Sequence, residues 1–319
     1  MLEKLNLNSL NSKKIFSTFE LELFVELIGN YIQWEYILDI LRIENDEDLI
    51  IQKIDKKSKI LMFESKNIIP KINRFDWILR KRLKQKSIDE FINKSFLYPV
   101  FLWLLSLNIL TFMLIYILPS IVNSFSSITN LNQTLETLIL ISQLLIGVEW
   151  GILLISIYFI ITIKDSKILS IYKFLYRKIP DNIWVYYVSY MYLSDLLYLL
   201  NLNIKIEDIL NILKYSHSII NKEISNNVKL CLRNGQSIKH SFDLIDFTFI
   251  KLIKIDDFER KFEKRLDNYL NVLHKQIEIN IKKISNYFML VVYIQIGLMV
   301  FLVYSVLLYP LKLIEGMNL

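Results

Sequence analysis

The chain has 319 residues, of which 53% are apolar and 22% charged, with only 6 glycines and 5 prolines. This composition excludes a disordered chain and a collagen-like repeat, and the single cysteine, Cys231, excludes an intrachain disulfide framework. The net charge of +6 does not by itself indicate nucleic-acid binding, because Lys and Arg cluster beside apolar segments. Residues 95–135 and 284–311 carry no charged side chain, and two such stretches indicate a membrane protein.

In chain order, the sequence begins with a short helical domain. Within it Phe75, Leu79 and Leu83 recur at the spacing that places apolar side chains on one face of a helix. Three later segments reach the roughly 20 residues that a helix needs to cross a bilayer core. The predicted order is a first domain (1–95), a span (96–118), a loop (119–136), a span (137–163), a second domain (164–286), a span (287–309) and a tail (310–319).

The positions of Lys and Arg predict the topology. Residues 80–95 carry six of them and residues 164–178 carry five, whereas the loop at 119–136 carries none. Basic residues beside a span tend to stay in the cytoplasm. We therefore expect a multi-pass protein of the cytoplasmic membrane with both helical domains in the cytoplasm and with the loop and the C-terminal tail outside.

The sequence predicts that the second domain is also helical. Residues 183–234 predict two or three helices, with a break at Asn201 to Asn203 and a stop at Asn234-Gly235, where a left-handed backbone is tolerated. An apolar stripe runs from Phe258 to Ile281, and neither Pro nor Gly interrupts residues 236–296, so this helix is expected to continue into the third span. The predicted fold class is all-α, with two cytoplasmic helical bundles and three transmembrane helices.

The chain also contains an internal repeat. WEYILDIL at residues 34–41 is similar to IEDILNIL at residues 206–213, and at the same offset Gly29 corresponds to Asn201. Both residue types tolerate a left-handed turn. Each copy precedes an apolar span that ends in proline, so a duplicated helical domain is expected rather than chance similarity in an Ile- and Leu-rich chain.

Four segments give the chain a resemblance to the type II secretion system F domain family, the membrane platform proteins of type IV pili, type II secretion systems and competence pseudopili. They are FLYPVFLWLLSLNILTFMLIYILPSIVNSF (96–125), LLYLLNLNIKIEDILNIL (196–213), CLRNGQSIKHSF (231–242) and LLYPLKLIEGM (307–317). The short first domain is closest to the competence-type members. Where the family has a Gly-Glu-Xaa-Xaa-Gly segment, this chain has Asp256 and Asp257 without the glycines.

The resemblance implies a non-enzymatic protein that couples a hexameric cytoplasmic secretion ATPase to the insertion or extraction of pilins or pseudopilins. It also implies a homo-oligomer in the lipid membrane, without direct nucleic-acid binding and without a cofactor. The sequence agrees, because it contains no phosphate-binding glycine loop, no zinc-ligand spacing and no nucleophile elbow. The alternative function is the membrane subunit of a small-molecule transporter, which predicts several polar sites within the membrane.

Three acidic residues are candidate partner contacts. Glu149 lies near the middle of the second span, where an acid costs roughly 2.5 to 3.5 kcal/mol on insertion scales. We expect it to contact a translocating pilin or another subunit, with Gly147 and Gly151 allowing close helix approach, or to bond within its own bundle. Asp256 and Asp257 are candidates for docking of the motor, with a solvated helix end as the alternative.

Overall fold

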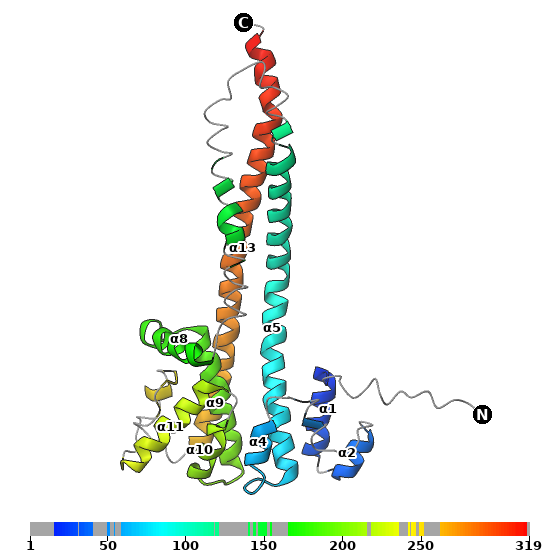
Figure 1. Cartoon of the computed structure of the whole chain (residues 1–319). Coiled ribbons are helices and arrows are strands. Elements are labelled where there is room, and N and C mark those ends of the chain that lie inside the picture. Colours follow the sequence, from blue (N-terminus) through cyan, green and yellow to red (C-terminus); the bar gives the residue numbers. More distant parts are fainter. Residues whose placement is uncertain are drawn as a thin grey trace, which may run out of the picture. The chain divides into compact units, whose positions relative to one another are not determined.

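All regular elements of the described chain are helices, which confirms the predicted all-α fold (Figure 1). The computed structural model describes residues 16–30, 32–40, 50–51, 54, 59–117, 119–120, 140, 143–144, 146–151, 154, 165–215, 218–235, 242, 244–246, 249–251 and 262–317. The helices are α1 (Thr18–Gly29), α2 (Trp34–Ile40), α4 (Lys59–Glu64), α5 (Lys71–Phe112), the π-helical turn η3 (Met113–Ile117), α8 (Asp165–Lys178), α9 (Ile183–Asn201), α10 (Ile206–Lys214), α11 (Ile219–Arg233) and α13 (Phe262–Met317).

The chain divides into two compact units. Unit 1 comprises residues 1–91 and 165–280, and unit 2 comprises residues 92–164 and 281–319. Both predicted helical domains therefore contribute to one unit, and the predicted spans fall in the other. Two of the three boundaries between the units lie inside α5 and α13, which are continuous helices.

Local sequence explains where the helices of unit 1 begin and end. Ser17 and Glu20 form a capping box at the start of α1, in which the Glu20 N–H donates to Ser17 Oγ over 3.2 Å. Asn203, with a φ of 56°, follows the end of α9. Gly235, with a φ of 73°, follows the end of α11. The predicted break and stop are both confirmed, and residues 183–234 contain three helices.

The helices of the two repeated segments begin and end at corresponding residues. Gly29 ends α1 and its counterpart Asn201 ends α9, whereas Trp34 begins α2 and its counterpart Ile206 begins α10. The burial also matches, because the counterparts of the buried Ile37 and Leu38 of α2 are the buried Ile209 and Leu210 of α10. In each copy the two helices contact each other.

A second stretch of the repeat, which the sequence analysis missed, lies at the start of the two long helices. Arg74-Phe75-Asp76 occupies the same place in α5 as Arg265-Leu266-Asp267 occupies in α13, counted from the first helical residue. Phe75 and Leu266 are both fully buried. In the next apolar pair, Leu79 is fully buried and Leu270 is 5% exposed. Each copy therefore ends in a long helix with the same buried face. We call residues 18–91 copy 1 and residues 183–280 copy 2.

The described residues contain two helical segments that are long and apolar enough to cross a membrane, Lys71–Ile117 and Phe262–Ser305. The prediction that the helix before the third span runs into it is confirmed, and α13 also continues beyond the predicted end of that span to Met317. Most of the second predicted span lies outside the described residues. Its described middle, residues 146–151, is helical.

Among its described residues, unit 2 buries few apolar side chains. Its core cluster joins Leu110, Met113 and Leu114 to Leu302 of α13, with Ile146 packed against it. The large apolar side chains of α5 and α13 that remain more than half exposed in this unit are Leu97, Tyr98, Phe101, Phe112, Tyr287, Leu290, Val291, Tyr293, Ile294, Val300, Phe301 and Tyr304. An apolar surface of this extent is typical of a protein that faces lipid.

Candidate functional site

A polar contact joins the two long helices of unit 2 near Pro99. Proline has no N–H, so the carbonyl of Ser95, four residues earlier in α5, loses its helical donor. The hydroxyl of Ser285 on α13 donates to this carbonyl over 2.6 Å. One turn further along, Trp103 and Phe288 meet edge to face with ring centroids 6.0 Å apart. The freed backbone group thus fixes how α5 and α13 pair in this unit.

Glu149, the predicted candidate in the second span, is hydrogen-bonded inside unit 2. The amide nitrogen Nε2 of Gln295 on α13 donates to Glu149 Oε2 over 3.0 Å. Gln295 is only 3% exposed. The bond within its own bundle is therefore present, whereas contact with a partner remains a prediction.

Two further predictions about this region stay predictions. A Cβ atom built on Gly147 or Gly151 meets no other atom of the described chain within 4 Å. The expectation that this pair allows a partner's helix to approach closely concerns contacts between molecules. Asp256 and Asp257 lie outside the described residues.

In unit 1, a buried carboxylate joins copy 1 to copy 2. Asp195 of α9 accepts a hydrogen bond from Trp77 Nε1 at Oδ1 over 2.9 Å. Its other oxygen, Oδ2, accepts from Lys81 Nζ over 2.7 Å, and the Lys81 and Asp195 side chains are 9% and 2% exposed. Both donors belong to α5. A buried ion pair whose two carboxylate oxygens are both bonded constrains the geometry of the two helices.

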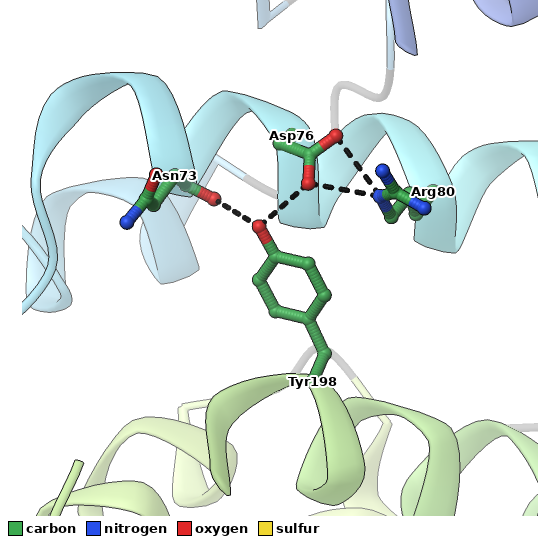
Figure 2. A network of polar contacts seen from close by, with 4 residues as sticks. All are labelled: Asn73, Asp76, Arg80 and Tyr198. Atoms are coloured by element: carbon green, nitrogen blue, oxygen red, sulfur yellow. Dashed lines mark hydrogen bonds and ion pairs between the residues drawn. The ribbon is translucent and has the colours of Figure 1, made fainter. Parts of the chain in front are cut away.

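A second polar group lies one turn along the same two helices (Figure 2). The Tyr198 hydroxyl of α9 lies 2.7 Å from Asp76 Oδ2 and 3.1 Å from the carbonyl oxygen of Asn73, and donates to them. Arg80 Nε lies 3.0 Å from Asp76 Oδ1 and 2.8 Å from Oδ2. Burial, followed by the Asp76 carboxylate, raises the pKa of Tyr198 well above its usual range, so the hydroxyl stays a donor at neutral pH.

Further polar contacts hold the long helices within unit 1. Tyr269 of α13 donates to Asp246, and the backbone N–H of Asp246 donates to Ser189 Oγ of α9 over 2.8 Å. Lys84 of α5 lies with Nζ 5.9 Å from the ring centre of Tyr190, and burial lowers the pKa of this lysine. Within unit 1, α5 is therefore bonded directly to α9, and α13 is linked to α9 through Asp246.

The polar residues that join the helices were not predicted from the sequence. Asp195 and Gln295 each stand among apolar neighbours within a helix, which is the signal that could have identified them. Among the described residues no three His, Cys, Asp or Glu side chains gather as a metal site. The arrangement holds and aligns helices. No family model, curated protein or solved structure matches this chain.

Proposed function

We propose that this protein is the membrane platform of a type IV pilus-like, type II secretion or competence machine. In this role it couples a cytoplasmic hexameric secretion ATPase to the insertion and extraction of pilins or pseudopilins. The proposal combines the resemblance of the four sequence segments with one structural observation. That observation is the continuity of α5 and α13 from the packed unit 1 into the apolar, exposed segments of unit 2.

The continuity supports the proposal for a mechanical reason. A motor in the cytosol can move a subunit embedded in the membrane only through a protein that is present in both phases. A helix without a break transmits displacement along its length better than two helices joined by a loop, because its backbone hydrogen bonds run through the junction. Both long helices run through the junction, and in α5 the backbone bond lost at Pro99 is replaced by the bond from Ser285.

The polar contacts within unit 1 support the same role. Lys81 and Asp195 bond α5 to α9, and Tyr269 and Asp246 fasten α13 to the segment that Ser189 of α9 binds. A load applied to unit 1 would therefore reach both long helices through directional bonds. Buried, bonded ion pairs fix one arrangement of helices more tightly than apolar contacts alone.

The proposed topology places unit 1 in the cytoplasm and the apolar segments in the cytoplasmic membrane. The two exposed apolar helix segments support membrane association, and the basic residues at 80–95 and 164–178 support the orientation. The second predicted span, with Glu149, completes a three-span protein whose C-terminal tail is outside. In this arrangement the ATPase contacts unit 1 and the pilin contacts unit 2.

Affinity purification of the full chain from membranes tests the proposal. Photo-crosslinking groups placed at exposed positions, Leu230 in unit 1 and Leu290 in unit 2, identify the partner of each unit. We expect a secretion ATPase at Leu230 and prepilin-like proteins at Leu290. Recovery of a solute-binding protein or a nucleotide-binding transport subunit, without either expected partner, would support the small-molecule transporter instead.

A further inference from the structure

The contact between the two copies uses one face of each helix. On α9 this face contains Met191, Asp195 and Tyr198, which are four and three residues apart and therefore lie on one side of the helix. Asp195 and Tyr198 bond to α5, and Met191 is 5% exposed. On α5 the matching face contains Asp76, Trp77 and Lys81, all buried.

The repeat places an equivalent face on α1 of copy 1. Leu21 and Phe24 of α1 are fully buried, as are their counterparts Leu193 and Leu196 of α9, so the two helices present the same side to the core. The counterparts of Met191, Asp195 and Tyr198 are Phe19, Leu23 and Glu26. Phe19 is 72% exposed, Glu26 is also exposed and Leu23 between them is half-buried, so this face of α1 is largely open.

The repeat also places an equivalent face on α13 of copy 2. Its residues Asp267, Asn268 and Val272 correspond to Asp76, Trp77 and Lys81 of α5. All three are exposed, and Val272 is 63% exposed although it is apolar and lies in unit 1. Among the described residues, the interface between the copies is thus made once, and its two halves remain exposed, one on α1 and the other on α13.

We infer that a second copy of the chain closes these faces, with α1 of one molecule docked on α13 of the next in the way that α9 docks on α5. The residues at the centre change together: the Lys81 and Asp195 ion pair is replaced by Val272 and Leu23, so a polar pair becomes an apolar one. Glu26 takes the place of Tyr198 and would lie between Lys264, the counterpart of Asn73, and Asp267, the counterpart of the acceptor Asp76. Charge therefore does not decide this contact, and the inference depends on the open faces and the apolar centre.

Different surfaces of the two molecules meet in this interface. Reciprocal contacts close a two-fold dimer, and contacts that pass from one molecule to the next build a larger ring or an open array. A ring would place several pairs of long helices around one axis. The inference rests on the repeat and on burial, and does not depend on the proposed function.

Site-directed cross-linking of the full chain in membranes tests the inference. In a Cys231→Ser background, chains carrying Leu23→Cys and Val272→Cys are given different tags and co-expressed, and a short bis-maleimide is added. We expect a cross-linked heterodimer from the mixture and little product from either chain alone. Leu230→Cys, which is 57% exposed in the parent, replaces Leu23→Cys as the matched control. A mixture that does no better than this control, or equal product from one chain alone, would overturn the inference.

Charge substitutions give a second test that does not depend on cross-linking. Val272→Lys changes an exposed side chain, so the fold is retained and self-association in nanodiscs should weaken at least about tenfold, because an unpaired charge enters the interface. Leu23→Asp should have the same effect, and co-expression of the two variants should restore association by rebuilding the Lys81 and Asp195 arrangement between molecules. If both variants associate like the parent, or if the combination is not rescued, α1 and α13 do not meet.

Discussion

The hydroxyl of Ser285 donates a 2.6 Å hydrogen bond to the carbonyl of Ser95, which is the acceptor that Pro99 deprives of its donor within α5. A proline inside a helix usually costs about 3 kcal/mol or more, in part through this lost bond. An unpaired carbonyl buried between helices would be costly, because it is removed from water without another donor. The side chain of a neighbouring helix thus makes the proline tolerable.

This relationship predicts a non-additive pair of substitutions. Ser285→Ala should lower the stability of the parent protein by about 1 to 2 kcal/mol, because the Ser95 carbonyl is left unpaired. In a Pro99→Ala background the N–H of residue 99 can serve that carbonyl, so Ser285→Ala should cost much less there. Thermal unfolding of all four proteins in detergent measures the coupling. Equal effects of Ser285→Ala in both backgrounds would show that the serine does not compensate for the proline.

The buried ion pair of unit 1 predicts a large loss of stability when one partner is removed. Asp195→Asn leaves Lys81 buried without its counter-charge, and we expect a cost of about 3 to 5 kcal/mol. Glu223→Gln is the control, because its ion pair with Lys173 is 30% and 38% exposed and should contribute less than about 1 kcal/mol. Chemical denaturation followed by circular dichroism compares the two. A similar cost for both variants would contradict a structural role for Asp195.

The elements of this fold were largely predictable because they depend on local patterns. The helix ends at Asn201 and at Asn234-Gly235 follow from residues that accept a left-handed backbone, and the structure has φ values of 56° at Asn203 and 73° at Gly235. The continuity of α13 follows from the lack of Pro and Gly before the third span. Neither prediction required knowledge of which helices meet.

The bonds between helices could not be predicted, because they join residues far apart in the chain. Nothing near Asp195 in the sequence identifies Lys81 as its partner, and Pro99 does not reveal that Ser285 will serve the Ser95 carbonyl. Glu149 was recognised by its position in an apolar segment, but its donor Gln295 was not. The second stretch of the repeat was missed because fewer residues separate the two matching segments in copy 1 than in copy 2.

The contact of Glu149 with Gln295 predicts how the carboxyl group can be replaced. Glu149→Gln retains an acceptor for the Gln295 amide, so we expect stability and pilus assembly close to those of the parent. Glu149→Leu removes the acceptor and should cost about 0.6 to 2 kcal/mol, the range of hydrogen bonds between membrane helices. Melting in detergent and pilus counts on cells measure the two effects. A Glu149→Gln protein that is stable but assembles no pili would instead indicate a charge-dependent contact with a pilin.

Tyr186 predicts a loss of stability at alkaline pH. Burial, followed by the nearby Asp181 carboxylate, raises the pKa of Tyr186 to about 12, whereas an unfolded tyrosine has a pKa of about 10. The folded state favours the protonated hydroxyl, so its contribution is complete below about pH 10 and is lost as the pH rises toward 12.

The size of this effect follows from comparison with a variant that cannot ionise. Between about pH 10 and pH 12 the parent should lose on the order of 1 to 2 kcal/mol relative to Tyr186→Phe. Tyr36→Phe, which removes the hydroxyl of a side chain that is 65% exposed, is the control. Melting temperatures across this pH range give the result. Parallel profiles for the parent and Tyr186→Phe would show that burial does not protect this hydroxyl.

The central claim is that unit 1 lies in the cytoplasm and is carried by helices that cross the membrane, and thiol labelling tests it directly. Cys231 is the single cysteine of the chain and lies half-buried on α11, so it reports on unit 1 alone. We predict that an impermeant maleimide leaves Cys231 unlabelled in intact cells and labels it once the membrane is opened and the protein mildly unfolded. In a Cys231→Ser background, Leu230→Cys provides a more exposed reporter in the same helix and Asn318→Cys should label from outside. Labelling of Leu230→Cys in intact cells would place unit 1 outside and contradict the account.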